Sequence, residues 1–408
     1  MELSDPESNL LGHIRDEEVV GLLRQLIRIP SENPPGNEKD ISEFLRKEMS
    51  SLGLRTSFIE PKEGRVNVIG ELKGSYEGPT LIFNCHTDTK PAIPSMAAED
   101  SWKYDPFEGI VENGRVYGRG ASDMKGGLAS VMAAIKAVVN AGVEMKGSII
   151  VQCVADEEMG SGLGTMRLLE EGLLKGDAAI VPEPTGLEIC PAELGALWLE
   201  ILVKGRMGHA GRPWLAVNAI RKAIKIVDAL DKDVSRRRKK LKHKMFPKHP
   251  TLNVGAIEGG HHPGTVPGIC KLLIDTRLVP GETIRGCYER IKDILKRLQE
   301  EDREEFVVES KLFATGGADP CEISQKEPIV GVAKESYRKV LGKKAPISGF
   351  TGFSDARILV NDAHIPTIVF GPGTPGTEHT INEYAEVQKV VDAAKIFALI
   401  IVNFTGSF

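Results

Sequence analysis

Residues 81–88 are LIFNCHTD, a short run of apolar residues that leads directly into a histidine and an aspartate. The same pattern, an apolar segment followed at once by acidic residues, recurs at 151–158 (VQCVADEE) and 178–183 (AAIVPE). Between the first two segments, residues 124–139 place apolar side chains three and four positions apart, which predicts a helix with Ser122 or Asp123 capping its start. Strands separated by helices predict a largely parallel sheet covered by helices.

From residue 192 the pattern changes. Segments 196–204, 252–257, 269–276 and 306–313 are predicted strands, and segments 216–230 and 282–299 are predicted helices. Their order, β-α-β-β-α-β, is that of a ferredoxin-like module. The α/β pattern then returns, with helices expected near 329–341 and 385–400. The sequence therefore predicts an α/β fold, a parallel-rich sheet flanked by helices over 1–191 and 315–408, with an α+β ferredoxin-like domain inserted at 192–314.

Composition narrows the class of protein. Of the 408 residues 41% are hydrophobic and 27% are charged, which is typical of a globular chain and excludes a disordered one. No apolar stretch approaches the roughly 18 residues of a membrane helix, and the N-terminus has no apolar signal core. We therefore expect a cytoplasmic protein that does not bind membranes, with its six cysteines as buried free thiols.

The net charge of −5 gives no general attraction to nucleic acid. One stretch, 236–248, is strongly basic (RRRKKLKHKMFPK). We interpret it as a solvated helix end and loop, so no nucleic-acid partner is expected. Binding of nucleic acid through this stretch stays open as an alternative and predicts an affinity that falls steeply with salt.

Histidines and carboxylates follow the predicted strands. The carboxyl ends of parallel strands meet at one edge of an open sheet, where such sheets bind ligands. Several carboxylates crowded there would repel one another, and a pair of divalent cations removes that repulsion. Imidazole with carboxylate suits zinc, with cobalt or manganese possible. The residues expected at this edge are His86, Asp123, Glu158, Glu183 and His379.

Six segments carry a resemblance to a known family. They are HTD (86–88), GRGASDMKGG (118–127), ADEEMGS (155–161), EPT (183–185), GRMGHAGRP (205–213) and GPGTPGTEHTINEY (371–384). Together they resemble the M20 family of zinc amidohydrolases and peptidases, and within it the branch of acetylornithine deacetylase and succinyl-diaminopimelate desuccinylase. The resemblance spans nearly the whole chain and implies a zinc-peptidase-like catalytic domain with an inserted lid.

The resemblance implies a metal centre with two zinc ions per subunit. By motif, His86, Asp123 and Glu183 would hold one ion, and Asp123, Glu158 and His379 the other, with Asp123 bridging the two. A metal-bridging hydroxide would balance the charge that three carboxylates leave on two Zn²⁺ ions and would attack the amide.

The resemblance also implies roles beside the metals. Glu157 would be the general base and then the acid. His209 would reach the active site of a partner subunit, which implies a homodimer formed through the lid domains. Arg277 would grip a free carboxylate of the substrate, and Thr351 lies in the loop 348–357, which resembles the family's substrate-side loop. Asp88, two residues from His86 on a strand, is expected to accept the imidazole N–H.

Two departures from the family pattern bear on the substrate. Thr265 stands where many relatives have asparagine, and Phe350 and Phe353 in the loop 348–357 suggest an apolar pocket. The sequence favours hydrolysis of an N-acyl amino acid, a small molecule with a free carboxylate. A carboxypeptidase or dipeptidase, a deformylase or deacetylase of a non-amino-acid amine, and a non-catalytic metal-bound scaffold stay open as alternatives.

Overall fold

The computed structural model describes residues 3–92 and 101–406. Its internal contacts divide the chain into two compact units. The first unit comprises Met1–Ala192, Glu322–Phe350 and Ser354–Phe408, and the second comprises Glu193–Cys321 and Thr351–Phe353. The second unit is therefore an insertion in the first, to which the short segment at 351–353 is added.

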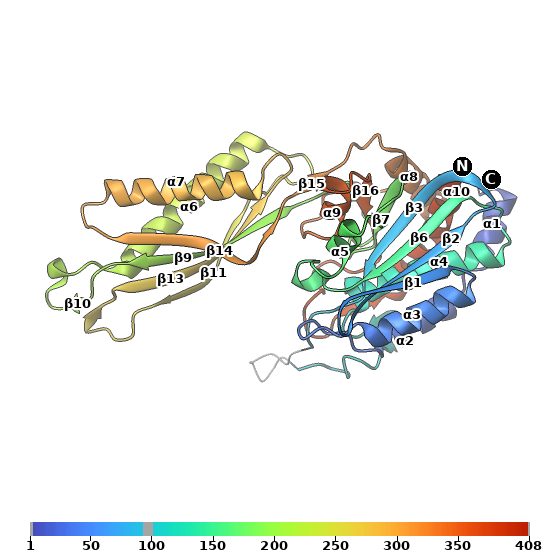
Figure 1. Cartoon of the computed structure of the whole chain (residues 1–408), viewed down its shortest axis with the longest axis horizontal. Helices are drawn as coiled ribbons and strands as arrows, with labels where there is room; N and C mark the ends of the chain where they lie inside the picture. Colours follow the sequence, from blue (N-terminus) through green and yellow to red (C-terminus); the bar gives the residue numbers. More distant parts are fainter. Residues whose placement is uncertain (1–2, 93–100, 407–408) are drawn as a thin grey trace. The chain divides into compact units, whose positions relative to one another are not determined.

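A six-stranded sheet forms the centre of the first unit (Figure 1). Its strands lie in the order β1 (Arg55–Lys62), β2 (Arg65–Lys73), β6 (Lys146–Val154), β3 (Tyr76–His86), β7 (Ala178–Val181) and β16 (Thr367–Val369). The strands β6, β3, β7 and β16 are parallel to one another, whereas β1 and β2 form an antiparallel hairpin added to β6. The predicted parallel-rich α/β fold is confirmed, and the hairpin is an addition that the sequence pattern did not predict.

Helices of this unit pack against the sheet and against each other. They are α1 (Asp5–Gly12), α2 (Asp16–Ile27), α3 (Lys39–Ser51), α4 (Gly126–Asn140), α5 (Thr165–Glu170), α8 (Pro328–Leu341), α9 (Ala356–Asn361) and α10 (Val387–Thr405). The last helix, α10, is largely apolar and buried, and it packs on α4, α8 and α2. Phe397 of α10 meets Phe83 of β3 edge to face, with 5.4 Å between ring centroids.

The start of α4 differs from the prediction. Neither Ser122 nor Asp123 caps the helix, because a wide turn, η1 (Ala121–Lys125), precedes it and α4 begins at Gly126. Asp123 has φ −124° and ψ 98°, an extended conformation. The extended backbone leaves the Asp123 carboxylate available for contacts outside the helix.

Short elements complete the first unit. A three-stranded antiparallel sheet is formed by β4 (Ile110–Glu112), β5 (Arg115–Tyr117) and β17 (Tyr384–Glu386). The turn η2 (Glu157–Met159) follows β6 directly. The strands β8 (Ala192–Glu193) and β15 (Cys321–Glu322) pair where the chain passes from one unit to the other.

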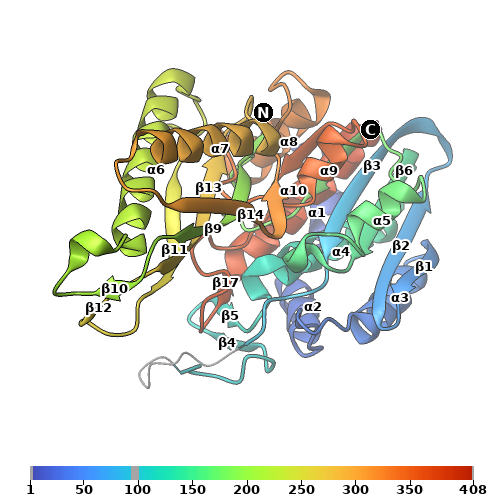
Figure 2. The same ribbon diagram turned by 60° about the vertical axis from the view of Figure 1, so that its left-hand side comes forward.

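The second unit has the β-α-β-β-α-β order predicted for it (Figures 1 and 2). The elements are β9 (Gly195–Lys204), α6 (Ala219–Leu241), β11 (Leu252–Gly259), β13 (Ile269–Leu278), α7 (Ile284–Glu301) and β14 (Val307–Ala318). The strands form an antiparallel sheet in the order β11-β13-β9-β14, and α6 and α7 cover one face of it over a shared apolar core. This arrangement is the ferredoxin-like one.

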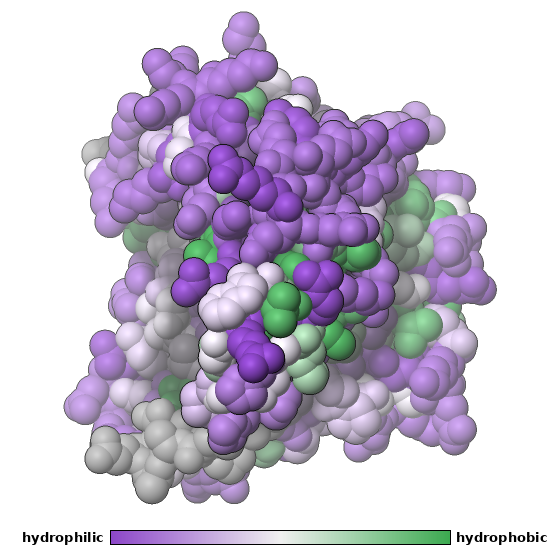
Figure 3. Space-filling model, turned by 90° about the vertical axis from the view of Figure 1, so that its left-hand side faces the viewer, coloured by the Kyte–Doolittle hydropathy of each residue, from purple (hydrophilic) through white to green (hydrophobic). Residues whose placement is uncertain are grey.

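At one end of this unit, β10 (Gly208–His209) pairs with β12 (Thr265–Val266), and the turn η3 (Pro213–Leu215) follows β10. Figure 3 views the protein from the side on which β10 lies in Figure 1, and the surface there is mostly hydrophilic with small hydrophobic patches. The helix α6 runs through the first part of the basic stretch at 236–248. Arg237 in that stretch is buried and ion-paired with Asp233 and Glu282, so this residue is not solvated, in contrast to the expectation for the stretch.

Two further expectations concern the whole chain. Within residues 3–92 and 101–406, no helix is both long and apolar enough to cross a membrane. All six cysteines are buried thiols, as predicted.

Candidate metal centre

The carboxyl edge of the central sheet gathers the predicted ligands. His86 is the last residue of β3, Glu158 lies in η2 directly after β6, and Glu183 follows β7. Because β3, β6 and β7 run parallel, these three side chains arrive at the same edge. Asp123 comes from η1 and His379 from the loop between β16 and β17.

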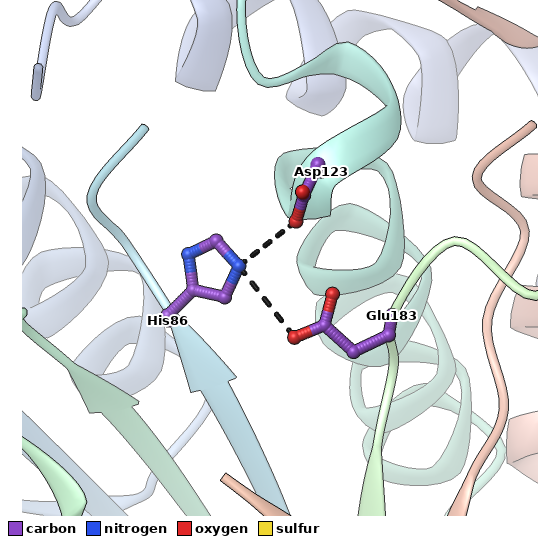
Figure 4. Close-up of side chains that lie close together, drawn as sticks. All are labelled: His86, Asp123 and Glu183. Carbon is purple, nitrogen blue, oxygen red and sulfur yellow. Dashed lines mark hydrogen bonds and ion pairs between the residues drawn. The ribbon is translucent and has the colours of Figure 1, made fainter. Parts of the chain in front are cut away.

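The first group of ligands is His86, Asp123 and Glu183 (Figure 4). His86 Nε2 lies 3.0 Å from Asp123 Oδ1 and 3.6 Å from Glu183 Oε1. The His86 side chain is only 1% exposed. One donor atom from each residue therefore faces a common point inside the protein.

The second group is Asp123, Glu158 and His379. His379 Nε2 lies 3.1 Å from Asp123 Oδ2 and 3.3 Å from Glu158 Oε2. Asp123 thus turns one carboxylate oxygen to each group and is shared by both. The His379 side chain is 47% exposed, so the second group is the one nearer to solvent.

The electrostatics of the cluster show how strongly these groups depend on one another. Burial opposes the charged form of His86, but Glu183 and Asp123 outweigh it and raise the pKa of the imidazole well above its usual value. For His379, Asp123 and Glu158 likewise overcome burial and raise the pKa to about 10. Burial and the neighbouring Asp123 raise the pKa of Glu183. Buried carboxylates packed this closely require positive charge between them.

The donor set fits a pair of divalent cations. Each group offers at least three ligand atoms within 4.8 Å of one another, drawn from imidazole nitrogens and carboxylate oxygens. Zinc, cobalt and manganese all accept this mixture of donors. The residues present therefore suit a centre of two cations joined through Asp123.

Glu157 lies next to a ligand but belongs to neither group. Burial raises the pKa of its carboxyl group well above the usual value, and the neighbouring acids Asp355 and Glu158 add to the rise while His86 opposes it. A carboxyl group with a raised pKa beside a metal centre can accept a proton and give it back.

Asp88 acts differently from the expectation. The His86 Nδ1 atom bonds to the main-chain oxygen of Asp88 at 2.8 Å, not to its carboxylate, whose nearer oxygen is 3.7 Å away. The Asp88 carboxylate instead accepts the backbone N–H groups of Glu157 and Glu158, both at 3.2 Å, and Asn33 Nδ2 at 2.8 Å. These bonds tie the carboxylate to Asn33 and to η2, and Asp88 thus holds that turn in place.

A buried ion network behind η2 was missed from the sequence. Asp156 has φ 70°, in the left-handed region, and its Oδ1 accepts from Arg65 at 2.9 Å and Asn33 at 3.3 Å. Arg65 also makes a two-pronged pair with Glu38 at 2.7 and 2.8 Å. Asp156 adjoins the quoted acidic run, but Arg65, Asn33 and Glu38 lie in segments with no motif, so nothing in the sequence pointed to them.

Two more residues touch the ligands. Glu383 accepts the backbone N–H groups of Ser122 at 2.9 Å and Asp123 at 3.1 Å, and also pairs with Arg119 at 2.6 Å. Glu383 stands inside the quoted segment 371–384, so its position was signalled although its role was not. Lys90, which follows β3, forms an ion pair with Glu158.

The remaining predicted site residues belong to the second unit. His209 on β10 is exposed and lies directly opposite Thr265 on β12, and its Nδ1 accepts the N–H of Gly211 at 3.0 Å. The unusual threonine and the predicted catalytic histidine are therefore neighbours. Thr351, also exposed, lies in the short segment 351–353 of the same unit.

Arg277 on β13 is part of a compact cluster. Its Nε donates to Asp275 Oδ1 at 3.0 Å, and Trp198 Nε1 donates to the other oxygen of Asp275 at 2.8 Å. Phe353 contacts both Trp198 and Arg277: it meets the Trp198 ring edge to face, with 5.6 Å between centroids, and its centroid is 5.8 Å from the Arg277 guanidinium carbon. The guanidinium charge is thus already balanced by Asp275.

Comparisons with known proteins bear on the family of this chain. The model of peptidase family M20/M25/M40 matches residues 82–403. Two proteins named N-formyl-4-amino-5-aminomethyl-2-methylpyrimidine deformylase are similar to this chain. The protein from Bacillus subtilis is 31% identical, and the alignment covers 95% of each chain. The protein from Halalkalibacterium halodurans is 29% identical, and the alignment covers 95% of this chain and 94% of the other.

A solved structure, a tripeptidase from Staphylococcus aureus, has a TM-score of 0.77 and 22% identity, covering 97% of this chain and 100% of the other. The two relatives carry a deformylase name, so they support the family but not the narrower deacetylase and desuccinylase branch that the sequence motifs suggested. This chain belongs to peptidase family M20/M25/M40, and it is a metal-dependent amidohydrolase.

Proposed function

We propose that this protein is a deformylase that uses two metal ions to release formate from an N-formylated amine of the aminomethylpyrimidine class, a substrate with no carboxylate. The observation that carries the chemistry is the sharing of Asp123 between the two ligand groups, next to Glu157. The observation that favours this substrate is the similarity, over 95% of the chain, to two proteins with that name. This proposal replaces an N-acyl amino acid as the favoured substrate.

The chain's own residues would divide the work. His86, Asp123 and Glu183 would hold one ion, and Asp123, Glu158 and His379 the other. The bound ions would polarise the amide carbonyl and lower the pKa of the attacking water. Glu157 would take a proton from that water and deliver it to the amine nitrogen as the C–N bond breaks, so that formate and the free amine leave.

The cluster around Arg277 supports a substrate without a carboxylate. An arginine that recognises a carboxylate works best when its guanidinium fork is free to make a two-pronged pair. Here Asp275 already occupies the Arg277 Nε atom and offsets part of the guanidinium charge, so only the edge formed by Nη1 and Nη2 is left for a second carboxylate. The rings of Trp198 and Phe353 beside it offer flat apolar surfaces of the kind on which aromatic groups stack.

A second part of the proposal concerns assembly. The segment around β10 exposes three large apolar side chains, Met207 (62% exposed), Trp214 (73%) and Leu215 (61%). Apolar side chains grouped in this way are typical of protein interfaces. We infer that a second copy of this chain covers them, forming a homodimer through the second unit with His209 at the contact.

The test is a substrate panel with zinc supplied. It comprises an N-formyl aminomethylpyrimidine, the N-acetyl form of the same amine, an N-acetyl amino acid and a dipeptide. The proposal predicts that kcat/KM is highest for the formyl compound, that a chelator abolishes turnover, and that Arg277→Met keeps most of it. Faster cleavage of the N-acetyl amino acid or the dipeptide would contradict the proposed substrate.

A further inference from the structure

Lys90 holds Glu158 from three directions. Its Nζ lies 3.1 Å from Glu158 Oε2, and Nζ also donates to the main-chain oxygen of Glu158. The backbone N–H of Lys90 donates to Glu158 Oε1 at 3.2 Å. Both carboxylate oxygens of a proposed metal ligand are therefore engaged by one residue.

The ammonium group and the second ligand group use the same atom. Glu158 Oε2, which faces the Lys90 ammonium, is also the oxygen 3.3 Å from His379 Nε2. The Glu158 side chain is 5% exposed and that of Lys90 is 32% exposed, so water only partly screens the charges. The bond to the Glu158 main-chain oxygen keeps the ammonium group from simply turning away.

The first ligand group has no such competitor. In the part of the chain that the structure describes, no lysine or arginine side chain forms an ion pair with Glu183 or Asp123, whose ion pairs are with histidines. The second ligand group therefore has one positive charge beside it that the first group lacks, the ammonium group of Lys90.

We propose that Lys90 competes with a metal ion for Glu158 and so weakens the second metal site relative to the first. The inference rests on the proposed dinuclear centre. Two positive charges on one carboxylate oxygen repel each other, and the repulsion is largest where water is partly excluded. Lys90 thus acts as a positioning residue that keeps Glu158 in place and sets the metal concentration at which the second site fills.

The experiment measures metal binding and not turnover. Co²⁺ is titrated by calorimetry into chelator-treated protein, and the visible Co²⁺ spectrum follows each step. The proteins are wild type, Lys90→Met, Lys90→Gln and Lys90→Arg. The matched control is Lys136→Met. This change removes a half-exposed lysine of α4 that forms an ion pair with Glu18 of α2 at 2.6 Å. Circular dichroism checks that each variant folds. If one of the two neutral variants does not fold, the other still provides the test.

The proposal predicts that Lys90→Met and Lys90→Gln lower the second dissociation constant by about tenfold and leave the first nearly unchanged. Lys90→Arg keeps the charge and should resemble wild type, as should Lys136→Met. If the second dissociation constant is unchanged in the neutral variants, or if both dissociation constants shift equally, the proposed role of Lys90 is wrong, and the proposed function is not affected. Fewer than two ions bound by wild type would overturn the dinuclear centre and with it the proposed function.

Discussion

At the scale of single residues, the site depends on Asp123 and on what fixes it. Its two oxygens face His86 and His379, at 3.0 and 3.1 Å. Its backbone N–H is bound by the buried carboxylate of Glu383, which Arg119 balances. The bridging position is therefore set by backbone and side chain together.

Glu157 offers the sharpest test of the chemistry. Glu157→Gln removes the proton carrier but none of the proposed ligands, so we expect kcat to fall by about 10²–10⁴-fold. Elemental analysis should still find the same number of ions per chain as in wild type. If the variant hydrolyses the substrate at the wild-type rate, Glu157 is not the base.

Glu383 should matter for both stability and metal binding. Glu383→Gln leaves the Arg119 charge, 3% exposed, without its partner, so the free energy of unfolding should fall by about 3–5 kcal/mol. Both metal dissociation constants should rise, because the Asp123 backbone loses a charged acceptor. Urea unfolding and calorimetric titration measure these effects.

The double variant Arg119→Met with Glu383→Met is the control, since removing both charges should cost less stability than removing one. A Glu383→Gln protein as stable as wild type would show that the pair is not needed to hold Asp123.

At the scale of elements, a charge pair joins the two helices of the second unit. Lys222 of α6 lies 2.7 Å from Asp302, which caps the end of α7, and the two side chains are 3% and 7% exposed. Burial opposes the charged form of Asp302, but Lys222, the N–H of Glu304 and Lys225 outweigh it and hold the pKa of Asp302 below its usual value.

This shift predicts a pH dependence. In the unfolded chain the carboxyl group of Asp302 has a pKa of about 3.9. The folded protein therefore keeps Asp302 charged at acidic pH values where the same group in the unfolded chain is already protonated. Its stabilising contribution is therefore complete above about pH 4 and is lost as the pH falls further. Asp302→Asn should lower the free energy of unfolding by about 1–2 kcal/mol at pH 7, and the gap from wild type should close toward pH 2. A gap that widens in acid would contradict this account.

Long periodic elements were predictable and local geometry was not. The alternation in β9 reflects burial on one face, and the three-four spacing of large apolar residues in α4 marks a helix that is buried on most sides; a sequence shows both patterns directly. The hairpin of β1 and β2 has no comparable pattern, since β1 is largely exposed. The predicted start of α4 was wrong because contacts with Glu383, 260 positions away, hold the backbone of Asp123 extended.

The same distinction holds in the site. The proposed ligands follow strand ends, so their positions could be inferred from the sequence. Asp88 was expected to bond His86 through its carboxylate, but two N–H groups of η2 compete for that carboxylate. Partners such as Arg65 and Asn33 come from segments distant in the chain, and only the fold brings them to Asp156.

At the scale of the whole molecule, the proposed machinery is divided between two units. All five proposed metal ligands and Glu157 belong to the first, whereas His209, Arg277 and Thr351 belong to the second. If His209 serves the site of a partner subunit, activity requires two chains.

A mixing experiment tests this division. Glu157→Gln and His209→Asn should each be nearly inactive alone. In a mixed dimer, one site combines an intact Glu157 with an intact His209 from the other chain. Mixing equal amounts under conditions of subunit exchange should therefore restore about a quarter of wild-type activity. No recovery, with exchange verified by sedimentation of tagged chains, would contradict action across the dimer.

The most direct measurement of the central claim is anomalous scattering at the zinc edge from crystals of the zinc-loaded protein. The account predicts two peaks per chain, one among His86, Asp123 and Glu183 and one among Asp123, Glu158 and His379, with Asp123 in contact with both. A single peak, or two peaks that do not share Asp123, would contradict it.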